Sequence, residues 1–180
     1  MSIAWNTKIS VSITGSPTKF IQCETLWGEL KISNKIEMIN KDEYTILKIN
    51  DGYLKILSYD AGCDKLIFQP ITTIIRTPIN PGVLLKLSIT PDYSISVTRC
   101  QSFYHFKEKL NPDKTNKVLF ANESQNILNF KNPPRQKTES SVLSEIQILK
   151  HEIIDYNDSV YSFDVWNTKN YVANGLIVNS

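Results

Sequence analysis

Short apolar stretches alternate with turn residues along most of this chain, a pattern that predicts β-strands rather than long helices. Two hairpins are indicated by apolar runs on either side of a turn: residues 10–13 and 18–22 around Gly15-Ser16-Pro17, and residues 44–49 and 53–58 around Asn50-Asp51-Gly52. A third is indicated by the turn Thr90-Pro91-Asp92-Tyr93, which a strand over residues 94–98 follows. Short strands at this spacing predict an all-β barrel or twisted sandwich.

Residues 65–76 form a longer run that is rich in β-branched side chains. Pro70 lies within it and predicts a bulge or a sheet edge, because proline cannot donate a ladder hydrogen bond. Residues 23–30, around Glu24 and Trp27, are the only fair candidate for a helix. We therefore expect one short helix in a domain that is otherwise built from strands.

The pattern changes over residues 108–140, which are rich in Asn, Pro and charged residues. Apolar side chains are scattered there, for example Leu119, Phe120 and Phe130. Low hydrophobicity with this much charge does not offset the entropy of ordering a chain, so most of this segment is predicted to be a mobile loop.

Composition narrows the class of protein. With 180 residues, 41% hydrophobic and 21% charged, the chain has enough apolar material for one globular domain. Its net charge of +2 is too small to indicate nucleic acid or membrane as a partner. Cys23, Cys63 and Cys100 lack metal-ligand spacing, so no metal, cofactor or disulfide is predicted. Without a signal peptide or a membrane-length apolar run, we expect a cytoplasmic monomer.

The C-terminal segment, residues 160–180, holds the strongest candidate chemistry, with the sequence VYSFDVWNTKNYVANGLIVNS. Where Asn precedes a hydroxyl residue, as in Asn179-Ser180, its side-chain amide can attack its own main-chain carbonyl and cleave the following bond. The segment resembles the C-terminal motif of inteins. The positions that fall on or close to that motif are Val160, Tyr161, Val165, Asn170, Tyr171, Ala173, Asn174, Gly175, Val178 and Asn179.

Two further segments agree with the resemblance. Inteins open with Cys or Ser and carry a Thr five residues on, and this chain reads Ser2-Ile3-Ala4-Trp5-Asn6-Thr7 after Met1. Inteins also place T-x-x-H at the end of a β-hairpin, and here Thr98 is the motif Thr while Gln101 stands where the His belongs. A register starting at Thr90 would put a turn where the motif needs a strand, so we prefer the register at Thr98.

The resemblance implies a Hint-type, horseshoe-shaped intein fold, in which the loop over residues 108–140 takes the place of a homing endonuclease. Met1 would then be the last residue of the preceding host segment, the N-extein. Residues 2–179 would be the splicing domain, and Ser180 would be the first residue of the C-extein. The flanking exteins would be its partners. A Ser start with a following Ser also resembles inteins inserted in family B DNA polymerases.

The same resemblance implies a role for each candidate residue. Ser2 would attack the carbonyl of Met1, with Thr98 stabilising the oxyanion through its hydroxyl and backbone N–H. Ser180 would take over the resulting acyl group, and Asn179 would cyclise to release the joined exteins. The protein would act once, on itself, with no nuclease activity.

Departures from the family pattern fall on proton carriers. Gln101 could hold or polarise the scissile amide at the N-terminal junction but could not transfer a proton. Ser162 occupies the place of a tail Asp, and Asp164, two residues on, faces the same side of a strand. Lys169 stands at the place of a tail His, and the residue directly before Asn179 is Val178 and not a His.

The missing His leaves two alignments open. With a one-residue deletion, Asn179 is the cyclising residue; without one, Ser180 holds the terminal position and the C-terminal junction cannot be cleaved. The first is preferred because Asn-Ser is a competent junction. A catalytically silent domain of the same fold, acting as a passive insert or binding module, is the alternative function. A hedgehog-type autoprocessing domain fits less well, because such domains lack the Asn junction.

Overall fold

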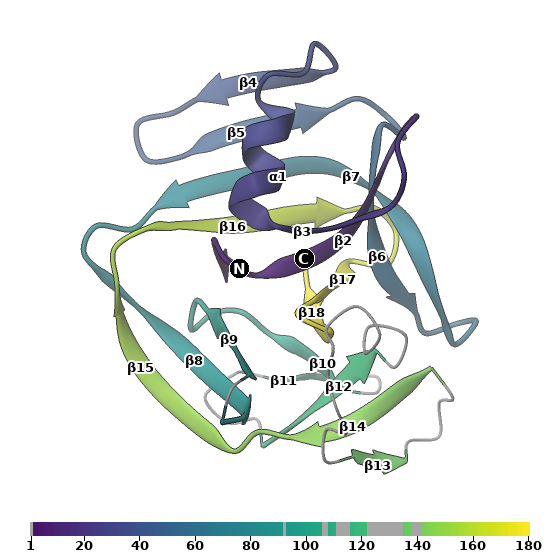
Figure 1. Ribbon diagram of the computed structural model, residues 1–180, viewed down its shortest axis with the longest axis vertical. Helices are drawn as coiled ribbons and strands as arrows, with labels where there is room; N and C mark the ends of the chain where they lie inside the picture. The colour runs from purple at the N-terminus through teal and green to yellow at the C-terminus, as the bar shows by residue number, and fades with distance from the viewer. Residues whose placement is uncertain (1, 92, 106–107, 111–115, 122–134, 138–141) are drawn as a thin grey trace.

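The computed structural model describes residues 2–91, 93–105, 108–110, 116–121, 135–137 and 142–180. Within them the chain forms strands joined into a closed, strongly curved β-structure, with one short helix. In Figure 1, β7 and β16 cross the domain side by side, while β8 and β15 curve around one flank and the two ends of the chain lie inside that curve. The prediction of a mostly β domain is confirmed. None of the described helical residues forms a segment able to cross a membrane.

The elements, in chain order, are β1 (Ile3–Ala4), β2 (Lys8–Ile13), β3 (Lys19–Gln22), α1 (Cys23–Leu30), β4 (Ile36–Asn40), β5 (Thr45–Ile49), β6 (Leu54–Asp60), β7 (Lys65–Pro78), β8 (Gly82–Thr90), β9 (Tyr93–Val97), β10 (Phe103–His105), β11 (Glu108–Leu110), β12 (Lys117–Ala121), β13 (Arg135–Lys137), β14 (Leu143–Gln147), β15 (Lys150–Tyr156), β16 (Ser159–Val165), β17 (Asn170–Ala173) and β18 (Leu176–Asn179). The predicted helix at residues 23–30 is therefore confirmed.

Two of the three predicted hairpins form, and one does not. β2 pairs with β3, and β8 pairs with β9, both antiparallel as expected. The strands on either side of Asn50-Asp51-Gly52 also form, but β5 pairs with residues 73–76 of β7, whereas β6 pairs with residues 65–70. The turn therefore joins strands of two different sheets, because β5 and β6 each pair with a different half of the long strand β7.

Pro70 lies at the point where β7 changes partners. It is the last residue of β7 opposite β6, facing Lys55, and the next residue faces β16. The register of β7 and β16 shifts at Asp164 and Val165, so a bulge adjoins the proline, as its presence predicted.

The prediction of a mobile loop over residues 108–140 is wrong for β12. Residues 118–121 of this strand are buried, and β12 pairs with β14 over its whole length. Phe120 also faces Leu176 of β18, which ties the strand to the C-terminal hairpin. The apolar run is only four residues long, so the polar composition around it concealed a core strand. Residues 111–115, 122–134 and 138–141 lie outside the described part of the chain.

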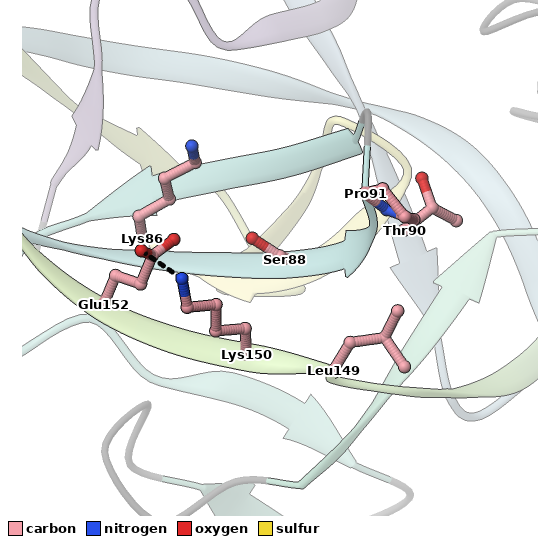
Figure 2. Close-up of a pocket in the computed structure, with 7 residues that line it drawn as sticks. All are labelled: Lys86, Ser88, Thr90, Pro91, Leu149, Lys150 and Glu152. Carbon is pink, nitrogen blue, oxygen red and sulfur yellow. Dashed lines mark hydrogen bonds and ion pairs between the residues drawn. The ribbon is translucent and has the colours of Figure 1, made fainter.

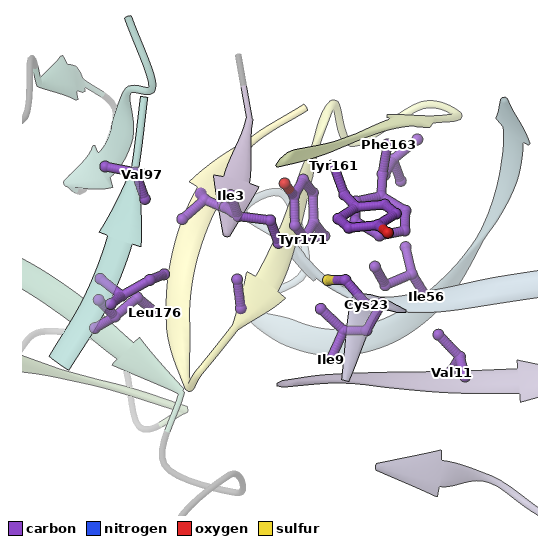
Figure 3. Packing of buried hydrophobic residues seen from close by; sticks show 14 of the residues in the cluster. Ile3, Ile9, Val11, Cys23, Ile56, Val97, Tyr161, Phe163, Tyr171 and Leu176 are labelled. Carbon is purple, nitrogen blue, oxygen red and sulfur yellow. The ribbon is translucent and has the colours of Figure 1, made fainter. Parts of the chain in front are cut away.

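The core closes around the strand that follows Ser2. Ile3 is fully buried and faces both Val97 of β9 and Tyr161 of β16; Figure 3 shows its side chain among Val97, Tyr161 and Tyr171. Full burial of an aliphatic side chain contributes about 1.5–3 kcal/mol. Packing of this one residue therefore holds its neighbour Ser2 in a defined position.

Gly175 is the glycine whose replacement we expect to cost most. Its φ of +79° is left-handed, and an added Cβ would lie 2.3 Å from an atom of the Phe120 ring. Gly15 has nearly the same φ, +80°, with no atom within 4 Å, and is a matched control. Gly15→Ala should cost only the backbone strain of about 1 kcal/mol, whereas Gly175→Ala should cost about 2–4 kcal/mol in all. Urea unfolding midpoints measure both, and equal losses would contradict the close approach.

Candidate active site

A single turn between β9 and β10 reaches both candidate junctions. We call residues 98–102 the junction turn; it is closed by a hydrogen bond of 2.8 Å from the Gln101 N–H to the Thr98 carbonyl. On one side β9 pairs with β1, with Val97 facing Ile3; on the other β10 pairs with β18, with Phe103 facing Val178. Antiparallel registers therefore bring the start of the turn to Ser2 and its end to Asn179.

At the N-terminal junction, Thr98 holds both main-chain groups of Ser2. The Ser2 N–H donates to the Thr98 hydroxyl oxygen at 3.1 Å, and the Thr98 N–H donates to the Ser2 carbonyl at 3.0 Å. The first bond binds the amide that joins Met1 to Ser2. These bonds hold Ser2 in place, and a role for Thr98 in stabilising the oxyanion stays a prediction. Met1 lies outside the described residues.

The hydroxyl of Ser2 has a partner that the sequence had not assigned to the site. Ser2 is 9% exposed, and its Oγ shares a hydrogen bond of 2.7 Å with the Oγ of Ser162. Pairing of β1 with β16, in which Ile3 faces Tyr161, brings the two serines together. A signal was present in the sequence, because Ser162 stands at the place of the tail Asp, but its contact with Ser2 depends on the pairing of β1 with β16.

Asp164 and Lys169 bond to each other at the surface. Lys169 Nζ lies 3.2 Å from Asp164 Oδ1, and Thr72 donates to Asp164 Oδ2 at 2.9 Å. Both charged side chains are more than half exposed, so the pair contributes at most about 1 kcal/mol. Ser162 and Asp164 lie two residues apart on β16, but neither the Asp164 nor the Lys169 side chain is bonded to the described atoms of Ser2 or Asn179, and their roles stay a prediction.

At the C-terminal junction, both polar groups of the peptide between Asn179 and Ser180 are held. Gln101 Nε2 donates to the Asn179 carbonyl at 2.7 Å, and the Ser180 N–H donates to the Lys169 carbonyl at 3.0 Å. Lys169, whose φ of +52° is left-handed, bonds to this peptide through its main chain, whereas its side chain pairs with Asp164. Gln101 was expected at the N-terminal scissile amide; its side chain is instead bonded at the opposite junction.

The side chain of Asn179 is enclosed and bonded to Ser102. Asn179 is 2% exposed, and its Nδ2 donates to the Ser102 hydroxyl at 3.1 Å and to the Ser102 carbonyl at 3.3 Å. Nothing in the sequence singled out Ser102, because its place depends on the pairing of β10 with β18.

The hairpin that carries Asn179 is fixed at both ends. Asn174 and Gly175 turn the chain with φ values of +47° and +79°, a conformation that Asn and Gly favour in tight hairpin turns. At the other end Asn170 faces Asn179, and its amide bonds to both main-chain groups of Tyr59, at 2.9 and 3.0 Å. Asn179 therefore lies on a strand whose register cannot slip without breaking these bonds.

The groups bonded to the two junctions are uncharged at neutral pH. They are hydroxyl, amide and main-chain groups of Thr98, Gln101, Ser102, Ser162 and Lys169. Burial raises the pKa of nearby Tyr161, whose hydroxyl also donates to Glu24, so this side chain stays protonated. The contacts of the two junctions therefore offer positioning and hydrogen bonding rather than proton transfer by a titrating side chain.

A surface hollow elsewhere on the domain plays no part in this arrangement. Figure 2 shows it on the ribbon of β8 and β15. Its lining residues are Lys86, Ser88, Thr90, Pro91, Leu149, Lys150 and Glu152. Lys150 and Glu152 form an ion pair of 2.6 Å, which lowers the pKa of the Glu152 carboxyl. None of the junction residues lines this hollow.

Solved inteins share the whole architecture. The crystal structure of the transcription factor IIB Mvu mini-intein has a TM-score of 0.74 at 16% identity, covering 99% of this chain and 99% of that chain. An intein from a hyperthermophile gives 0.74 at 15% identity, again covering 99% of each. A KlbA intein precursor from Methanococcus jannaschii gives 0.69 at 17% identity, covering 99% of this chain and 90% of that one. The chain has the intein fold.

At these identities the likeness is one of fold. No protein-family model and no curated protein matches the sequence. Because this chain and the Mvu mini-intein cover 99% of each other, the intein fold is present here without an endonuclease domain. The Hint-type architecture expected from the sequence is confirmed.

Proposed function

We propose that this intein-fold domain splices itself out of a host chain, joining the exteins on either side. The observation that carries the proposal is the junction turn. Its first residue, Thr98, binds the amide of Ser2, and Gln101, three residues on, binds the carbonyl of Asn179. A purely passive insert has no need to hold both junction peptides with one turn.

The first two steps move the N-extein. Ser2 Oγ attacks the carbonyl carbon of Met1, the C–N bond breaks, and the hydroxyl proton passes to the freed amine of Ser2. Ser180 Oγ then attacks the same carbonyl in the new ester, and its proton passes to the departing Ser2 Oγ. Thr98 and Ser162 hold the amide and the hydroxyl of Ser2 during the first exchange.

The last two steps release the domain. Asn179 Nδ2 attacks its own main-chain carbonyl carbon, forming a succinimide as the bond to Ser180 breaks; Nδ2 loses one proton and the Ser180 amine gains one. That amine then attacks the ester carbonyl and restores a peptide bond between the exteins. Every step is intramolecular, and well-aligned intramolecular groups reach effective molarities of about 10⁵ M or more.

The contacts of Asn179 favour the alignment with a one-residue deletion. Its side-chain amide is buried, and the carbonyl and the N–H of the peptide that joins it to Ser180 are both hydrogen-bonded. A residue that cyclises needs this kind of fixed position. In the other alignment, with Ser180 as the terminal residue, these bonds would not act on a peptide that is cleaved. The exteins are the proposed partners. A host among the family B DNA polymerases gains no support from these neighbours, and a monomeric, cytoplasmic state stays a prediction.

Intact mass after expression between two unrelated tags tests the proposal. We expect the mass of the ligated tags together with the mass of the free domain. A precursor carrying both Ser2→Ala and Asn179→Ala is the control and should stay whole. A parent precursor that also stays whole over days would support the silent alternative.

A further inference from the structure

We infer that Gln101 is a catalytic residue for cleavage at the C-terminal junction, where its side-chain N–H stabilises the oxyanion that forms on Asn179. The inference rests on the proposed function and deepens it. Sequence reasoning assigned Gln101 to the N-terminal scissile amide, where it replaces a histidine. Its hydrogen bond to the Asn179 carbonyl places it instead at the C-terminal junction, where it would stabilise an oxyanion.

The distance suits that role. When Asn179 Nδ2 attacks the main-chain carbonyl carbon, negative charge develops on the carbonyl oxygen. Gln101 Nε2 already lies 2.7 Å from that oxygen, within the range of about 2.7–3.1 Å expected of an oxyanion donor. The donor keeps its own protons throughout, so a non-titrating amide is sufficient for it.

The orientation of the amide is fixed by its surroundings. Gln101 is fully buried, and Nε2 also donates to the Ser102 carbonyl at 3.1 Å. A flipped amide would direct Oε1 at two carbonyl oxygens and repel both. The main chain of Gln101 is in turn fixed by its bond to Thr98. The donor therefore meets the developing charge without reorganising.

The other end of the same amide carries a cost. Gln101 Oε1 is buried, and no described group donates a hydrogen bond to it. A buried polar atom without a partner costs about 1–3 kcal/mol of stability. A residue chosen only for packing would be an apolar side chain of similar shape, such as methionine. The hydrogen bond to Asn179 explains why a glutamine, and not an apolar side chain, is found at this position.

This asymmetry separates a catalytic role from a structural one. Gln101→Met keeps the length and removes both the unpartnered Oε1 and the donor to the Asn179 carbonyl, so its two effects on stability oppose each other and the urea midpoint should change little. The same substitution should slow release of the C-terminal tag by about 10²- to 10³-fold, the loss typical of one oxyanion donor. Release is measured at pH 7 in a Ser2→Ala precursor, in which the N-terminal step is blocked. Arg99→Ala, in the exposed part of the same turn, is the matched control and should stay within about threefold of the parent.

Gln101→Glu provides an independent arm. As a carboxylate the side chain faces two carbonyl oxygens and cannot donate, so release should be as slow as in Gln101→Met. Relative to the parent, the rate should recover as the pH falls and the carboxyl takes up a proton, because the acid form again has an O–H to donate.

Two results would overturn the inference. If Gln101→Met releases the tag at the parent rate, or loses rate only in step with its urea midpoint, Gln101 is not the oxyanion donor although Asn179 cyclises. If the Ser2→Ala precursor releases no tag at all, the proposed function itself fails, and the role of Gln101 fails with it.

Discussion

Asn179→Ala should abolish cleavage at the C-terminal junction and leave the N-extein in an ester-linked intermediate. Alanine has no side-chain amide, so the nucleophile proposed to attack the carbonyl of residue 179 is lost, whereas the bonds around Ser2 are untouched. The branched species, in which Ser180 carries the N-extein, should therefore accumulate. It is measured by mass before and after mild hydroxylamine, which cuts esters but not peptide bonds.

Asn34→Ala is the matched control, since Asn34 is exposed and far in sequence from the junctions. It should splice as the parent does. Continued release of the C-extein from the Asn179→Ala precursor would show that Asn179 is not the cyclising residue. The alignment that places Ser180 in the terminal position makes a different prediction, because the parent itself would then show no cleavage there.

Ser2→Ala should abolish hydroxylamine-sensitive cleavage at the N-terminal junction, because alanine has no hydroxyl to attack the carbonyl of Met1. Release of the C-terminal tag should persist, since Asn179 has its own contacts with Ser102 and Gln101. Ser162→Ala should only slow the N-terminal step, by about three- to tenfold, because it removes one hydrogen bond to the nucleophile worth about 0.5–1.5 kcal/mol. N-terminal cleavage at the parent rate in Ser2→Ala would eliminate the mechanism.

The parts of this site that are local in sequence could be predicted. Thr98 and Gln101 are three residues apart because they begin and end one β-turn, and Asn174-Gly175 forms the turn its residue types require. The target of the Gln101 side chain could not be predicted in the same way. It depends on the register that brings Phe103 opposite Val178, and nothing in either segment alone specifies it.

The errors in the predicted fold have the same origin. The strands β5 and β6 look like a hairpin because an Asn-Asp-Gly turn joins them, yet each pairs with a different half of β7. β12 looks like part of a loop because its neighbours are polar, yet Phe120 is buried against the C-terminal hairpin. In both cases pairing with distant strands outweighs the local pattern.

The pairing of β1 with β16 also sets the timing of the chemistry in a growing chain. Ser2 leaves the ribosome first, but Ser162, which binds its hydroxyl, is made 160 residues later. At synthesis rates of about 5–20 residues per second, that interval is on the order of 10 s. During this interval β1 cannot pair with β16, and the hydroxyl of Ser2 lacks its hydrogen bond to Ser162. A ribosome would therefore complete most of the domain before the proposed attack of Ser2 on the carbonyl of Met1 could begin.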